Sequence, residues 1–146
     1  TFYQFGVFMM AKKRKSLKRP RSSAFSKQNG CCFYCRQPMW FNDPSELISK
    51  YGISLRDANI LKCTGEHLVA FKDGGGSGKK NIVAACLFCN QLRHKRKTNP
   101  TPEQYKEMIR NRMCQGRWHG LCLSGGLRNR NFVFDANQTL VGEKES

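Results

Sequence analysis

Residues 63–97, with the sequence CTGEHLVAFKDGGGSGKKNIVAACLFCNQLRHKRK, hold most of the chemically informative side chains of the chain. In chain order these are Glu66 and His67, a glycine-rich run at 74–78, Asn81, the pair Cys86 and Cys89, and Asn90, followed by Lys and Arg residues up to Lys97. The stretch therefore combines ionisable groups, two thiols and a cationic surface. We expect it to decide both the fold and the chemistry of the protein.

The pattern of this region predicts a strand, a long turn, a second strand and a helix. Residues 60–64, ILKCT, are typical of a strand, and residues 81–85, NIVAA, of a return strand. The glycine-rich run between them, 72–78, is too flexible for a regular element. It lacks the Gly-Lys-Ser/Thr ending of a nucleotide-binding loop, which argues against a phosphate cradle. From Leu87, apolar and basic residues recur at helical spacing until Pro100 ends them.

The cysteines predict a structural metal site. Two Cys-x-x-Cys pairs occur, Cys32 with Cys35 and Cys86 with Cys89. Two residues between cysteines let one turn aim both thiolates at one ion, and two such pairs complete a tetrahedral four-sulfur zinc site. A disulfide framework of a secreted basic toxin is the alternative reading. Cys31 could replace Cys32 as a ligand, and we expect the remaining cysteines to be small core residues: Cys63, Cys114 and Cys122.

The charge of the chain predicts a polyanionic partner. Its 146 residues carry 26 Lys and Arg against 10 Asp and Glu, a formal net charge of +16. A compact body with that charge repels itself unless a polyanion neutralises it, so nucleic acid is the expected partner. An anionic membrane would also fit the charge, but no stretch approaches the roughly 20 apolar residues that span a bilayer. We therefore expect no membrane partner.

The first residues bear on where the protein acts. The opening TFYQFGVFMM precedes its basic run, which is the reverse of a signal peptide. We therefore expect an intracellular protein, cytoplasmic if its source is a prokaryote or a phage. The sequence leaves open whether residues 1–8 precede a translation start at Met9 or Met10.

The region before residue 41 predicts a basic arm and a zinc knuckle. Residues 11–27 contain seven Lys or Arg by position 21 and no apolar periodicity, so we expect a disordered arm that can lie along phosphates. Residues 30–40 follow an Asn-Gly turn and are expected to form the knuckle, with Phe33 and Trp40 covering its sulfurs.

Capping signatures predict further helices. The residues Asp43-Pro44-Ser45-Glu46 and Thr101-Pro102-Glu103-Gln104 predict helices over 44–51 and 102–114. Residues 115–120, QGRWHG, mix basic and aromatic groups that suit backbone contact, although a tryptophan beside arginine is as often a core residue. From Ser124 onward we expect a largely flexible tail with one strand candidate at 132–134.

The central stretch also contains the groups that phosphodiester hydrolysis needs. That reaction requires a base for water, a cation for the developing negative charge, and a group that orients the base. His67 is the candidate base because histidine exchanges protons near neutral pH. Asn90, at the start of the expected helix, offers a carbonyl oxygen that could join Glu66 around a hard cation such as magnesium. Asn81 can bridge backbone or imidazole groups across the hairpin.

Geometry limits how two of these residues can cooperate. Glu66 and His67 are consecutive, so on an extended strand their side chains project to opposite faces. They can serve one site only where the strand ends or bends. The glycines that follow make such an end plausible.

These residues resemble the HNH endonuclease family and its ββα-metal fold. In that family an acidic residue and a histidine end the first strand, an asparagine starts the second, and His or Asn opens the helix. Here the corresponding residues are Glu66-His67-Leu68, Gly74-Gly75, Asn81-Ile82, Cys86-x-x-Cys89 and Asn90. The resemblance covers about residues 30–97. It implies that His67 is the general base, that Glu66 and Asn90 bind a catalytic Mg or Mn, and that Asn81 holds the hairpin.

The chain departs from the family pattern at two positions. Glu66 stands where the commoner residue of the family is Asp or His, and its extra methylene would move the cation outward. His94 lies four residues after Asn90 on the same helical face, so it competes with Asn90 as a ligand or binds phosphate.

We therefore expect an α+β protein with a small ββα-metal core, a zinc knuckle, flanking helices and a disordered basic N-terminal arm. The expected parts are the arm at 1–27, an HNH nuclease domain at 28–120 and a largely flexible tail at 121–146. The expected function is metal-dependent hydrolysis of DNA, with zinc as structural metal and no small-molecule cofactor. The alternative is a zinc-containing nucleic-acid-binding protein without catalytic activity.

The expected phosphate-binding residues are Lys79, Lys80, Arg93, His94, Lys95, Arg96, Lys97 and Arg117. The DNA target and the oligomeric state stay open.

Overall fold

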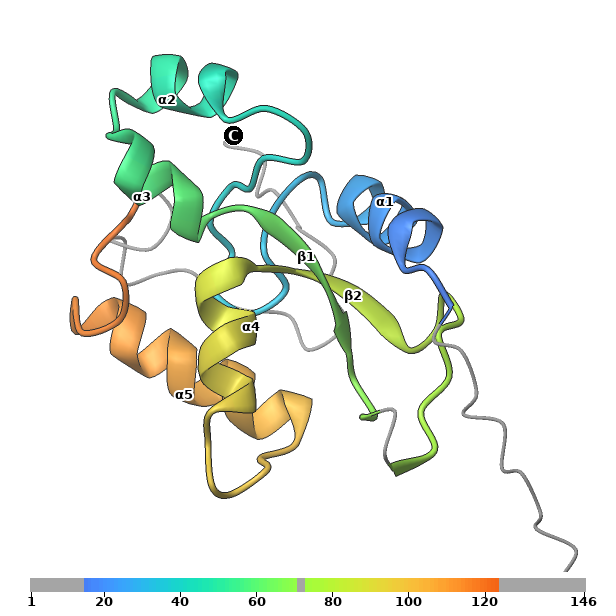
Figure 1. The fold of residues 1–146 in the computed structure, drawn as a ribbon. Coiled ribbons are helices and arrows are strands. Elements are labelled where there is room, and N and C mark those ends of the chain that lie inside the picture. Colours follow the sequence, from blue (N-terminus) through green and yellow to red (C-terminus); the bar gives the residue numbers. More distant parts are fainter. Residues whose placement is uncertain (1–14, 71–72, 124–146) are drawn as a thin grey trace, which may run out of the picture.

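The computed structural model describes residues 15–70 and 73–123 of the chain (Figure 1). It is a mixed α+β fold with a two-stranded antiparallel sheet and five helices among these residues. The elements are α1 (Lys18–Lys27), α2 (Ser45–Tyr51), α3 (Leu55–Ile60), β1 (Cys63–His67), β2 (Ile82–Cys86), α4 (Leu87–His94) and α5 (Pro102–Cys114). The first part of the expected arm and the strand candidate at 132–134 lie outside the described residues.

The predicted hairpin and helix of the central stretch are confirmed. β1 pairs with β2 in a register that runs from Cys63 opposite Cys86 to His67 opposite Ile82. α4 follows β2 without a linker, because Cys86 ends the strand and its sulfur accepts the Cys89 N–H at 3.5 Å as the helix N-cap. The expected strand over 60–64 was wrong in its first half. The Ser54 hydroxyl caps α3, and the helix continues to Ile60 before the chain turns into β1.

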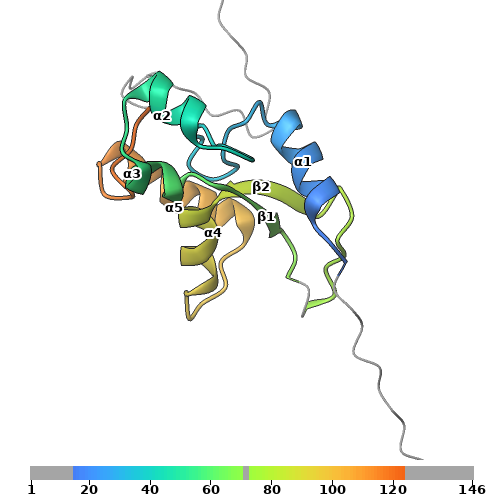
Figure 2. The same ribbon diagram turned by 45° about the horizontal axis from the view of Figure 1, so that its top comes forward.

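The hairpin lies between α1 and α4 (Figures 1 and 2). A Cβ at Gly65 would come within 3.3 Å of the Leu17 side chain, so this face of β1 packs against the start of α1. The neighbouring Glu66 side chain instead contacts Arg93 and His94 of α4. The two faces of β1 are therefore covered by different helices, as the alternation of a strand requires.

The expectation that residues 11–27 are disordered was wrong for residues 18–27, which form α1. Pro20 falls in the first turn, where a missing N–H costs no helical hydrogen bond. Ala24 is buried and Phe25 packs against Phe41 with ring centroids 5.5 Å apart. The helix is thus held by contacts with distant residues that the local charge pattern does not reveal.

Gln28, directly after α1, attaches this helix to β2. Its side-chain amide donates to the Ala84 carbonyl at 2.8 Å and accepts from the Ala84 N–H at 2.9 Å. The same carbonyl also accepts the Phe33 N–H at 2.9 Å. The Gln28 amide therefore makes the hydrogen bonds that a neighbouring strand would make at the edge of β2 away from β1. Backbone groups at this edge would otherwise be buried without partners.

The two other predicted helices are confirmed, each within a residue of its expected limits. α2 begins after Asp43, whose carboxylate accepts the Ser45 N–H at 3.1 Å, and ends at Gly52 in the left-handed conformation, with φ of 61°. α5 carries the expected capping box of Thr101 and Gln104. Its buried residues Tyr105 and Ile109 face the core. In the part of the chain that the structure describes, no helix is long and apolar enough to cross a membrane.

We predict that Gln28→Ala lowers the free energy of unfolding of the zinc-loaded protein by about 1–3 kcal/mol, because the Ala84 N–H would be left buried without an acceptor. Urea unfolding followed by circular dichroism measures this change. Gln91→Ala, at an exposed position of α4, is the matched control and should change stability by less than about 0.5 kcal/mol. Equal effects of the two substitutions would contradict the role of Gln28.

Candidate functional site

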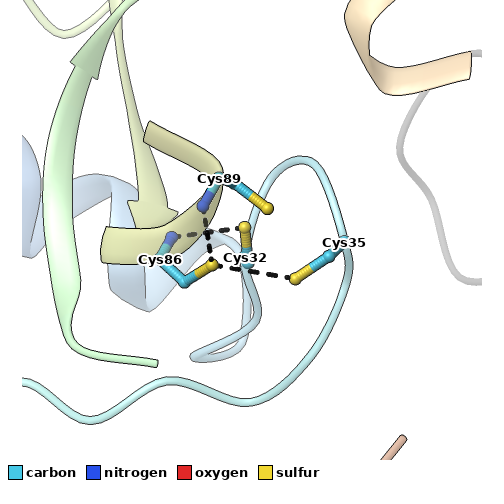
Figure 3. Close-up of side chains that lie close together, drawn as sticks. All are labelled: Cys32, Cys35, Cys86 and Cys89. Carbon is cyan, nitrogen blue, oxygen red and sulfur yellow. Dashed lines mark hydrogen bonds between the residues drawn. The ribbon is translucent and has the colours of Figure 1, made fainter. Parts of the chain in front are cut away.

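Four cysteine sulfurs meet in the interior at the start of α4 (Figure 3). The predicted ligands Cys32, Cys35, Cys86 and Cys89 are all buried, and their sulfur atoms lie within 4.8 Å of one another. The sulfurs of Cys35 and Cys86 are 3.9 Å apart. A tetrahedral zinc with Zn–S bonds of about 2.3 Å separates its sulfurs by about 3.8 Å, so the cluster fits that ion.

The fold brings the two pairs together from opposite sides. Cys32 and Cys35 lie in a knuckle closed by the Cys32 N–H bond to the Gln37 carbonyl at 2.9 Å. The Cys86 N–H in turn donates to the Cys32 sulfur at 3.3 Å, which joins the knuckle to the strand end. Cys31 does not replace Cys32, since its sulfur lies 3.7 Å from the Asn29 carbonyl and outside the cluster.

The electrostatics of the cluster favour a bound cation. Burial raises the pKa of the Cys35 and Cys89 thiols well above the ordinary value. Burial also opposes ionisation of Cys32, but hydrogen bonds from Cys35, Cys86 and Cys89 outweigh it and lower the pKa of Cys32. Without a cation, burial therefore opposes ionisation of Cys35 and Cys89. A divalent cation supplies the charge that lets all four ionise.

Trp118 covers the cluster, which sequence reasoning did not predict. Its indole N–H donates to the Cys89 sulfur at 3.3 Å, and the Tyr105 hydroxyl donates to the Cys89 carbonyl at 2.7 Å. Of the residues expected there, Phe33 is buried, but the Trp40 N–H donates to the Ala58 carbonyl at 2.7 Å. In the sequence, the signal for Trp118 was an aromatic residue between two polar neighbours. Its contact with the cluster agrees with the interpretation of Trp118 as a core residue.

The leftover cysteines divide between core and surface. Cys63 is buried, as expected, and burial raises the pKa of its thiol to about 12. Cys122 is half-buried. The expectation for Cys114 was wrong, because it is exposed at the C-terminal end of α5, on the side of the helix away from Tyr105 and Ile109.

Glu66 is almost completely buried, with a relative exposure of 1%. One carboxylate oxygen forms an ion pair with Arg93, and the other lies 3.0 Å from Nε2 of His94. Its negative charge is therefore compensated from α4. Among the described contacts, the neighbours of the carboxylate are these two side chains rather than Asn90.

His67 ends β1 on the other face of the strand from Glu66. The strand does end there, but pairing with Ile82 keeps the backbone extended, so the two consecutive side chains diverge. Nε2 of His67 is enclosed and has no hydrogen-bond partner among the described residues. An enclosed ring nitrogen without a partner is a group whose acceptor or donor capacity is still available.

Asn90 opens α4 next to β1. Its amide nitrogen donates to the Thr64 hydroxyl at 2.9 Å and to the Gly65 carbonyl at 3.4 Å. Its oxygen Oδ1 is enclosed without a donor in the described part of the chain. A carbonyl oxygen in that condition suits a hard cation, which prefers oxygen ligands.

Asn81 holds the loop that connects the strands. Its side chain accepts the Val69 N–H at 2.8 Å and donates to the Val69 and Gly76 carbonyls at 3.0 and 2.8 Å. Gly75 makes this closeness possible, since a Cβ there would lie 1.8 Å from the Val69 oxygen. Of the two roles considered for Asn81, the structure shows the bridge between backbone groups.

The basic residues assigned to nucleic acid fall into three groups. Those at exposed positions are Lys79, Lys80, His94, Lys95, Lys97 and Arg117. Arg96 is half-buried, with its guanidinium 5.9 Å from the centre of the Tyr105 ring. Arg93 is buried at 7% exposure and its guanidinium is directed into the protein, so the structure places it away from the surface where we expected it.

The exposed groups do not all share one surface. The end of α4 and the connecting end of the hairpin project from the same side of the molecule in both views (Figures 1 and 2). The segment after α5, which carries Arg117, runs instead toward α3 (Figure 1). The basic residues of 79–97 thus gather apart from Arg117.

Comparison with protein families agrees with this geometry. Residues 53–96 match the model of the HNH endonuclease family. The matched region contains β1, the loop, β2 and α4, and it therefore includes Glu66, His67, Asn81 and Asn90. No curated protein matches the chain. The resemblance seen in the sequence is confirmed, and the chain contains an HNH domain.

We predict that the purified protein holds one zinc ion and that Cys32→Ser loses it, because a serine cannot replace a thiolate in the buried cluster. The neighbouring Cys31→Ser is the matched control and should keep the metal. Elemental analysis of the dialysed proteins gives the zinc content. Loss of zinc from Cys31→Ser, or its retention by Cys32→Ser, would contradict the assignment of ligands.

Proposed function

With an HNH domain at residues 53–96 as the premise, we propose that the protein is a metal-dependent endonuclease that hydrolyses phosphodiester bonds in DNA. The observation that carries this proposal is the coincidence of the family match with three polar groups on β1 and α4, of which His67 lies on the opposite face of β1 from the other two. These are the Glu66 carboxylate, the enclosed nitrogen of His67 and the enclosed oxygen of Asn90. HNH domains generally act on nucleic acids, and the net charge of +16 agrees with such a partner.

In this proposal His67 is the general base. Its ring nitrogen has no competing partner among the described residues, so it can accept a proton from water. Because that nitrogen is enclosed, the ring or the loop after β1 has to shift before a water molecule at a phosphate can reach it. Asn81 limits this shift, since it holds the Val69 backbone from both sides.

The oxygens of Glu66 and Asn90 would hold magnesium or manganese, which when bound stabilises the negative charge that develops on the phosphate. Asn90 contributes Oδ1, and its amide nitrogen is fixed by Thr64, so the oxygen is already oriented. His94 already lies beside the second oxygen of Glu66 and is the competing ligand. Arg93 of α4 would fix the direction of the Glu66 carboxylate despite the extra methylene of glutamate.

The zinc is proposed to have a structural role. It would join the knuckle of Cys32 and Cys35 to Cys86 and Cys89 at the start of α4. Asn90 is the next residue, so the position of its oxygen follows from that of Cys89. We place the N-terminal boundary of the domain before α1 rather than at residue 28, because Gln28 ties this helix to β2.

DNA would bind across the side of the molecule where α4 and the hairpin project. Residues 79–97 contain no acidic residue, and neither does the segment 15–27 that contains α1. Exposed lysines at 79 and 80, before β2, and at 95 and 97, after α4, can contact phosphates.

One observation favours the second candidate function, a zinc-containing nucleic-acid-binding protein without catalysis. The Glu66 carboxylate is already engaged by Arg93 and His94, and a cation must share it with them. If it cannot, binding of DNA remains and hydrolysis does not occur.

We predict that the protein nicks supercoiled plasmid in magnesium or manganese and that His67→Ala lowers the rate by about 10²–10⁴-fold, since the water loses its base. Gel assays of nicking give the rate, while zinc content and DNA affinity serve as controls and should be unchanged. Absence of nicking by the unmodified protein with every divalent metal, together with normal DNA binding, would favour the non-catalytic alternative.

We also predict that DNA affinity falls steeply with salt, and that Lys95→Gln and Lys97→Gln each reduce the salt dependence by about one unit of slope, because each removes one phosphate contact. Fluorescence anisotropy at several salt concentrations measures the slope. Lys50→Gln, exposed on α2, is the control and should leave it unchanged. Equal slopes for all these variants would place the DNA elsewhere.

A further inference from the structure

Arg93 is a buried cation in a strongly basic segment. Its side chain lies on α4 at 7% exposure, one residue before the exposed His94 and two before the exposed Lys95. The sequence offers no distinction between Arg93 and its cationic neighbours. In the structure it differs from them because its guanidinium is surrounded by protein acceptors.

The acceptors come from two separate segments, residues 66–68 and Pro100. Nη1 of Arg93 contacts the Glu66 carboxylate and donates to the His67 carbonyl at 3.1 Å. Nη2 donates to the Leu68 carbonyl at 3.4 Å and to the Pro100 carbonyl at 3.5 Å. One planar group therefore joins the end of β1, the start of the loop and the connection between α4 and α5.

Both candidate catalytic positions of β1 are attached to this one guanidinium. The carboxylate of Glu66 is held through its side chain, and His67 is held through its main chain. A guanidinium has five donors in a rigid fork, which a lysine ammonium cannot reproduce. It also supplies the positive charge that a buried carboxylate requires.

We propose that Arg93 is a positioning residue of the candidate site. It orients the Glu66 carboxylate for a divalent cation and fixes the backbone of His67, whose ring is the proposed base. It makes no phosphate contact. The metal and base roles rest on the function proposed above. The geometric part of the proposal, that Arg93 orients both residues, stands on the contacts alone.

Arg93 has two opposite effects on the affinity of the site for a cation. A fixed positive charge near Glu66 repels a divalent ion, so its removal by itself would tighten cation binding. The orientation of a buried carboxylate has the opposite consequence, because Glu66 without Arg93 loses the contact that fixes its direction. We infer that orientation prevails, since the guanidinium contacts one carboxylate oxygen and leaves the other toward His94.

The first test needs neither metal nor activity. The chain has three histidines, so a ¹H–¹³C spectrum of labelled imidazole rings contains three signals for each of the two ring carbons that carry a hydrogen. In Arg93→Gln the signals of His67 and His94 should shift or broaden, whereas those of His119, which packs edge-to-face against Phe88, should stay. Arg56→Gln, the same change at an exposed position of α3, is the control and should move none of them. An unchanged His67 signal in Arg93→Gln would overturn the proposal.

The second test measures cation binding and DNA binding on zinc-loaded protein. Arg93→Gln should weaken Mn²⁺ binding at least tenfold in calorimetry, and Arg93→Lys, which keeps the charge without the fork, should weaken it as well. The salt dependence of DNA binding should equal that of the unmodified protein in Arg93→Gln but fall in Lys97→Gln. Mn²⁺ binding that is equal or tighter in Arg93→Gln, or a reduced salt slope, would contradict the role.

The two tests separate this proposal from the proposed function. If the unmodified protein binds no Mn²⁺ and does not nick DNA, the endonuclease proposal fails, and the histidine spectra still decide whether Arg93 orients His67 and Glu66. If the unmodified protein nicks DNA while Arg93→Gln matches it in Mn²⁺ affinity and histidine signals, the endonuclease proposal stands and the role of Arg93 is wrong.

Discussion

The four buried cysteine sulfurs form the constraint on which the remaining structure depends. Cys35 and Cys86 lie 51 positions apart in the chain, yet their sulfurs are 3.9 Å apart. The cluster holds the end of β2, the start of α4 and the knuckle after α1 at one point. Tyr105 and Trp118 bond to Cys89, so α5 and the segment after it are attached to the same place. A small core gains much from such a link, because little other buried surface opposes the entropy of the chain.

The interface between α4 and β1 is unusual in being built from polar groups. Asn90, Arg93 and His94 project from one side of the helix and contact Thr64, Gly65 and Glu66 of the strand. Burial of polar atoms is unfavourable unless they have partners, and most of these do. Nε2 of His67 and Oδ1 of Asn90 do not, within the described residues. Their position at the HNH match is consistent with partners that come from a cation, water or substrate.

Elements with strong local signals were predictable from the sequence. The capping box of Thr101 and Gln104, the glycine-rich turn and the spacing of the cysteines each depend on neighbouring residues, and all appear in the structure as expected. α1 was not predictable, because its basic, serine-rich sequence has no apolar periodicity that would mark a buried helix face. It becomes a helix through Leu17 against Gly65 and through Gln28 against Ala84, which are contacts across more than 45 residues of chain.

The sequence by itself determined which residues could carry the chemistry: the four thiolate ligands, Glu66, His67, Asn81 and Asn90. Their types and spacings are sufficient for that, since ligand chemistry belongs to the side chain. Only the tertiary structure decided what each of them contacts. Arg93 shows the reason most clearly, because an arginine in a basic segment can bind either a phosphate or a carboxylate, and the sequence does not distinguish the two. The depth of α4 against β1 places it beside Glu66 with only 7% of its surface exposed, and that depth is a property of the packed fold rather than of any local pattern.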